Sequence, residues 1–121
     1  MKVKIDTKEK FHVISILEPD LSANMTEELV EKLLLYTKFP IKNIVLDMGA
    51  VSNIELPAAV CLADLQEVFY DKNCSFVICE LQPPVEQFLD DNALLELLNV
   101  TPTISEGGDI VQMEEVEREL I

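Results

Sequence analysis

The chain has 121 residues, of which 49% are hydrophobic, and it carries a formal net charge of −14 at pH 7. This length suits one domain with a sizeable core, and the negative charge disfavours nucleic acid and anionic lipid headgroups as partners. Apolar runs fall short of the roughly 20 residues that a membrane span needs, so we expect no membrane insertion and a cytoplasmic location.

Two strands are predicted at the start of the chain, over residues 2–6 and 10–17. The polar residues 7–9 between them form a connection short enough for an antiparallel hairpin. The turn at residues 18–20 then ends the second strand.

A helix is predicted after this turn, with Asn24 as its N-terminal cap and Glu27 as the reciprocal partner of a capping box. Its apolar residues recur at the spacing of a helix that packs one face against a core. They are Met25, Leu29, Leu33 and Tyr36.

A central strand is predicted over residues 43–48, where a continuous apolar run is broken only by Asp47. Such a run is expected for a strand covered on both faces. Pro57 suits the first turn of the next helix, which we expect to reach about Tyr70. Residues 74–79 form another apolar run and predict a second buried strand.

The rest of the chain predicts a helix from about Pro83, a turn-rich segment at residues 94–98, a short strand at 101–104 and a final helix from about Asp109. The final helix has one charged face and one apolar face. The apolar face carries Ile110, Met113, Val116 and Leu120. This alternation of strands and helices, without a linker or repeat, predicts one α/β domain over residues 1–121.

The three cysteines, Cys61, Cys74 and Cys79, lie within apolar runs and predict buried thiols in a reducing compartment. No metal site is expected, because the only histidine, His12, lies in a different strand and no Cys-x-x-Cys spacing occurs. Glycine occurs only at positions 49, 107 and 108, which excludes a P-loop and a dinucleotide fingerprint. We therefore expect no cofactor.

Two segments carry a resemblance to a known family: Ile44-Val45-Leu46-Asp47 in the central strand, and residues 81–98, which read LQPPVEQFLDDNALLELL. With the order of the elements around them, they resemble the STAS domain of anti-sigma factor antagonists over nearly the whole chain. The resemblance implies a STAS-like single domain, with a mixed, mostly parallel sheet of four to five strands packed against about four helices. It also implies a protein partner, an anti-sigma factor of kinase-like fold.

The chain departs from that family at the loop before the second helix. The family loop usually reads Ile-Asp-Ser-Ser-Gly, and its first serine is phosphorylated by the partner kinase. Here the corresponding residues are Ile54, Glu55, Leu56, Pro57 and Ala58. Phosphorylation at the family position is therefore impossible, because leucine has no hydroxyl.

An exposed leucine at this position would present apolar area without a switchable charge, which favours constitutive association with a partner. The expected partner-binding residues are Asn53, Glu55, Leu56, Pro57, Ala59 and Val60. The alternative is that Leu56 turns inward and the loop only closes the domain.

Ser52, the only hydroxyl near the lost site, is a weak candidate for a displaced phosphoacceptor, although a loop serine more often satisfies local backbone groups. Asp47 and Glu55 would be the acids of a small enzyme, but loop ordering is the favoured role because no lysine or hydroxyl partner is placed beside them. His12 has no catalytic partner at recognisable spacing.

The leading hypothesis is a non-enzymatic protein-interaction domain that regulates its partner by binding and lacks the serine switch. Two alternatives share the architecture: a structural subunit of a membrane-associated transport assembly, such as a lipid transporter, and a self-associating scaffold. The sequence leaves a homodimer open.

Overall fold

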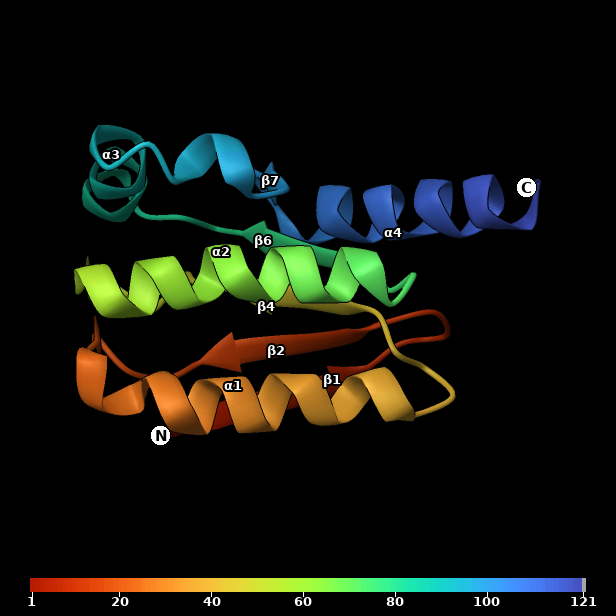
Figure 1. Cartoon of the computed structure of the whole chain (residues 1–121), viewed down its shortest axis with the longest axis horizontal. Coiled ribbons are helices and arrows are strands. Elements are labelled where there is room, and N and C mark those ends of the chain that lie inside the picture. Colours follow the sequence, from red (N-terminus) through yellow and green to blue (C-terminus); the bar gives the residue numbers. More distant parts are fainter. Residues whose placement is uncertain (121) are drawn as a thin grey trace.

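A five-stranded sheet forms the centre of the protein, as seen in a computed structural model that describes residues 1–120 (Figure 1). The strands follow the order β1-β2-β4-β6-β7. Their bounds are Val3–Thr7, His12–Ile16, Ile44–Asp47, Phe76–Cys79 and Val100–Thr101. Only β1 and β2 pair antiparallel, and the other neighbours are parallel. The predicted N-terminal hairpin and the mixed, mostly parallel sheet are confirmed.

Four α-helices pack around this sheet: α1 (Thr26–Leu35), α2 (Leu56–Asp71), α3 (Pro83–Asp91) and α4 (Ile104–Glu119). Short 3-10 turns cover Ala23–Met25, Tyr36–Lys38 and Leu95–Leu97. Figure 1 shows α1 and α2 side by side along the sheet, with α3 near one end. Within residues 1–120, no helix has the length and apolar character that crossing a bilayer requires.

The central strand β4 is covered on both faces, which explains its continuous apolar sequence. Because side chains alternate along a strand, Ile44 and Leu46 enter the larger core beneath α1 and α2. Val45 enters a smaller core with Val111 of α4. All four side chains are fully buried.

A second, two-stranded sheet was not expected from the sequence. It pairs β3 (Asp20–Leu21) in parallel with β5 (Asn53–Ile54). The alternation of an exposed polar residue with a buried leucine or isoleucine is a strand pattern, but two residues are too few to predict it.

The predicted cap of the first helix is wrong. α1 begins at Thr26, and Asn24 lies inside the preceding 3-10 turn without capping the helix. The Ala23 N–H instead donates to Oε1 of Glu55, at 2.6 Å. This acceptor is 32 residues away in the sequence, so no local pattern reveals it.

The last helix begins earlier than predicted, at Ile104, with the Thr103 hydroxyl accepting the Glu106 N–H at 3.1 Å. Gly107 and Gly108, which precede the predicted start, both lie within the helix and are buried. A Cβ on Gly107 would lie 2.9 Å from Cγ1 of Val45. The missing side chain lets α4 approach β4 closely.

Only part of the apolar face predicted for α4 packs on the protein. Ile110 is partly buried against the smaller core, whereas Met113, Val116 and Leu120 are 58%, 54% and 81% exposed. The helix instead turns Glu115 and Arg118 toward the strand ends, where Arg118 donates to Glu115 at 2.7 Å and to Ser75 at 3.0 Å. The bonds from Arg118 and then Asn43 lower the pKa of Glu115 from its usual value.

Replacing the two glycines tests the close contact between α4 and β4. We expect Gly107→Ala to lower the free energy of unfolding by about 1 kcal/mol, because overpacking of ~1–3 kcal/mol exceeds a gain in helix propensity of ~1 kcal/mol. Gly108→Ala should be neutral or stabilising, since its new Cβ would meet only the end of the Phe11 ring, at 2.7 Å, and that ring is half-buried.

Urea unfolding of both variants provides the measurement. In a double-mutant cycle, Gly107→Ala should lower the free energy of unfolding less in the Val45→Ala background than in the wild type, because the smaller strand residue removes the clash. Equal stabilisation by both alanine substitutions would contradict this account.

Candidate protein-interaction surface

The loop between β4 and α2 is anchored at its start by Asp47. One carboxylate oxygen, Oδ2, accepts the Ser15 hydroxyl of β2 at 2.8 Å. The other, Oδ1, accepts the Gly49 N–H at 2.9 Å. Both oxygens therefore hold the chain where it leaves the sheet.

The middle of the loop is hydrogen-bonded to the turn before β3, at the carbonyl of Pro19. This carbonyl accepts the backbone N–H of Ser52 at 2.8 Å and that of Asn53 at 3.1 Å. It also accepts the Ser52 hydroxyl at 3.1 Å. Ser52 is exposed, and its hydroxyl bonds to a backbone carbonyl that is 33 residues away in the sequence, not to the local backbone group that was expected.

Glu55 connects the end of the loop to the 3-10 turn that precedes α1. Its side chain accepts the Ala23 N–H, its own N–H donates to the Leu21 carbonyl at 3.0 Å, and its carbonyl accepts the Ala59 N–H at 3.0 Å. Glu55 and Asp47 thus bind different backbone segments rather than a shared ligand. Loop ordering accounts for both carboxylates.

The side chains left on the surface at the start of α2 are mainly apolar. Leu56, the first residue of the helix, is 46% exposed, and Val60 is 41% exposed. Asn53 and Pro57 are also exposed. The alternative prediction, that Leu56 turns inward, is therefore wrong, and the side chain is exposed.

Ala59 does not belong to this surface. It has no exposed area and lies in the larger core, as does its neighbour Ala58. Two adjacent small residues let the first turn of α2 pack closely, because neither side chain holds the helix away from the core. The remaining five predicted partner-binding residues, which we call the α2 surface, are Asn53, Glu55, Leu56, Pro57 and Val60.

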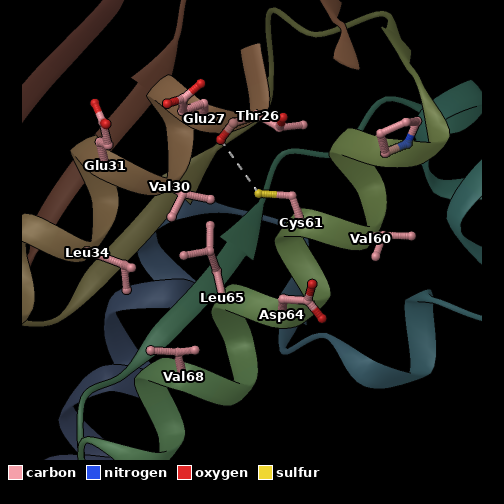
Figure 2. A pocket seen from close by; sticks show the side chains of 11 residues that line it. Thr26, Glu27, Val30, Glu31, Leu34, Val60, Cys61, Asp64, Leu65 and Val68 are labelled. Carbon is pink, nitrogen blue, oxygen red and sulfur yellow. Dashed lines mark hydrogen bonds between the residues drawn. The ribbon is translucent and has the colours of Figure 1, made fainter. Parts of the chain in front are cut away.

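A groove of about 460 Å³ continues from this surface between α1 and α2. Figure 2 shows its apolar side chains, which come from both helices. They include Val30, Leu34, Val60, Leu65 and Val68. The sequence did not reveal this groove, because it depends on how two separately predicted helices lie together.

The three cysteine thiols and the His12 ring are buried in the protein. Burial, followed by the nearby Asp47, raises the pKa of Cys79 to about 12. Burial also raises the pKa of Cys61 and of Cys74, which precedes β6 rather than lying in it. His12 is buried, with its ring nitrogens 2.8 Å from the Thr7 hydroxyl and 2.9 Å from the Ile41 carbonyl.

Along residues 1–120, His, Cys, Asp and Glu side chains form no group of three or more that could hold a metal ion. The arrangement offers an apolar surface and an ordered loop, in which the side chains of Asp47, Ser52 and Glu55 are hydrogen-bonded to other parts of the protein. Such a surface is suited to binding another protein.

Sequence and structure comparisons agree on one kind of domain. The sequence model of one protein family, described as the STAS domain, matches residues 2–107. No curated protein sequence matches the chain.

Among solved structures, a serine-to-glutamate variant of RsbS from Moorella thermoacetica is 21% identical, with a TM-score of 0.77 over 98% of this chain and 99% of that chain. A putative anti-sigma factor antagonist from Thermotoga maritima is 14% identical, with a TM-score of 0.77 over 91% and 94% of the two chains. At such low identities, these similarities show a shared fold.

The murine anion transporter Solute Carrier 26 family member A9 is also similar, at 18% identity and a TM-score of 0.73. The match covers 86% of this chain but only 18% of the transporter. The chain therefore corresponds to a small part of that protein.

Removing the Glu55 carboxylate tests whether it orders the 3-10 turn that precedes α1. In Glu55→Ala, the Ala23 amide should exchange with solvent about fivefold faster, corresponding to the ~1 kcal/mol of one hydrogen bond. Glu55→Gln should retain most of the protection, because its amide oxygen can still accept. Exchange rates from NMR would contradict this role if Ala23 behaved alike in the wild type and Glu55→Ala.

Proposed function

The chain belongs to the STAS domain family, and from this membership we propose that it is a non-enzymatic interaction domain that regulates a protein partner by binding. The α2 surface is the proposed contact, and residues 1–121 act as one domain. The single observation that carries the proposal is Leu56, which is 46% exposed at the first position of α2. Its place corresponds to that of the phosphorylated serine in the family loop.

The proposed binding has no phosphorylation switch at this position. A phosphoserine would add nearly two negative charges at a helix N-terminus, where they can bind backbone donors or repel a partner. Leu56 cannot gain such a charge. We do not propose Ser52 as a replacement, because its hydroxyl already donates to Pro19. Association would then be constitutive.

The proposed partner is a kinase-like anti-sigma factor in the cytoplasm. Support comes from the fold shared with anti-sigma factor antagonists over nearly the full length of both chains. The exposed apolar residues of the α2 surface support protein binding. The engaged oxygens of Asp47 and Glu55 favour this function over a small enzyme.

A second candidate is a subunit of a membrane-associated transport assembly. The observation that favours it is the same fold within the chain of an anion transporter. Purification of the tagged chain in parallel from the soluble fraction and from the detergent-solubilised membrane fraction separates the two candidates. Stoichiometric transporter subunits would support the second, and a kinase-like anti-sigma factor would support the first.

Leu56→Arg tests the α2 surface. We expect it to reduce recovery of the native partner by at least about tenfold, because a charge would be buried against an apolar contact. The measurement is quantitative mass spectrometry after affinity purification from native lysate.

Leu35→Arg is the matched control. Leu35 is 52% exposed at the opposite end of the α1 and α2 pair, so this variant adds the same charge away from the surface. Circular dichroism should show that both variants fold. Equal partner recovery with Leu56→Arg and the wild type would refute the proposed surface.

A further inference from the structure

The groove between α1 and α2 has an apolar floor that is open to solvent. Val30 and Leu34 of α1 and Val68 of α2 are half-buried, whereas Val60 is 41% exposed. Leu65 closes the bottom of the groove and is only 3% exposed. Figure 2 shows Val30, Leu34 and Leu65 between the two helices. Solvent therefore contacts apolar area that a partner can cover.

The rim of the groove is acidic. Glu27 and Glu31 lie on α1, and Asp64 lies on α2, on the other side (Figure 2). All three side chains are exposed. None of the described residues that line the groove is lysine or arginine. An occupant would thus meet apolar side chains in the centre and carboxylates along both sides.

We infer that this groove binds an amphipathic helix of the partner, with a narrow apolar stripe flanked by lysine or arginine. The apolar stripe would lie on the floor, and the basic side chains would pair with the rim. The groove residues span positions 26–34 of α1 and 57–68 of α2. At ~1.5 Å per residue, these segments are about 12 and 16 Å long, enough for two to three turns of a guest helix.

Charge favours this occupant over a second copy of the chain. Each copy has 23 acidic and 9 basic residues, so two copies would repel one another at an acidic groove. The inference rests on the proposed function, because Pro57 and Val60 belong to both the groove and the α2 surface. The inference adds to that function what the partner segment is: an amphipathic helix with an apolar stripe and basic flanks.

A synthetic helix provides the probe. A fluorescein-labelled amphipathic peptide of leucine and lysine should bind the full chain in an anisotropy titration, and more weakly at higher salt. An analogue with glutamate in place of every lysine should not bind. Upon binding, NMR methyl signals of Val30, Leu34 and Val68 should shift.

Charge reversal on the rim tests specificity. Glu31→Lys with Asp64→Lys should weaken binding by at least about tenfold, because two attractive pairs become repulsive. Glu117→Lys with Glu119→Lys changes the net charge equally on exposed positions of α4 and should weaken binding less than about threefold.

Equal losses in the two double variants, or methyl shifts outside the groove, would overturn the inference. Its failure is distinguishable from failure of the proposed function. Loss of native partner with Leu56→Arg, but no selective effect of rim reversal on the peptide, would reject only the groove. Normal partner recovery with Leu56→Arg would reject the α2 surface, and peptide binding would still report on the groove.

Discussion

Burial of β4 on both faces is the constraint on which the rest of the structure depends. Ile44 and Leu46 lie in the larger core and Val45 lies in the smaller one, without exposed surface. The strand pairs in parallel with both β2 and β6, so its carboxyl end meets theirs at one edge of the sheet. The loop into α2 begins at that edge, where α/β proteins commonly form binding sites.

Polar contacts then determine what this edge can do. Asp47, Ser52 and Glu55 each bond to another segment of the protein, which orders the loop. The surface left at the start of α2 is dominated by Leu56 and Val60. Apolar area on an ordered loop favours association, because little conformational freedom is lost when a partner covers it.

Much of the fold could be predicted from local patterns, since continuous apolar runs identify β4 and β6 and the position of Pro57 identifies the start of α2. Contacts between distant segments could not. Glu55 reaches Ala23, and the absence of a side chain at Gly107 lets α4 pack against Val45. The α2 surface was predicted through the family resemblance. The burial of Ala59 and the groove between α1 and α2 could not be predicted, because both depend on how the helices pack.

The central claim is that a partner contacts Leu56 directly. A photoreactive benzoylphenylalanine at position 56, irradiated in the purified native complex, tests it, with the same residue at position 35 as the control. We expect a crosslink to the partner from position 56 and none from position 35. Crosslinking from position 35 alone would place the interface at the other end of the helices and contradict the account.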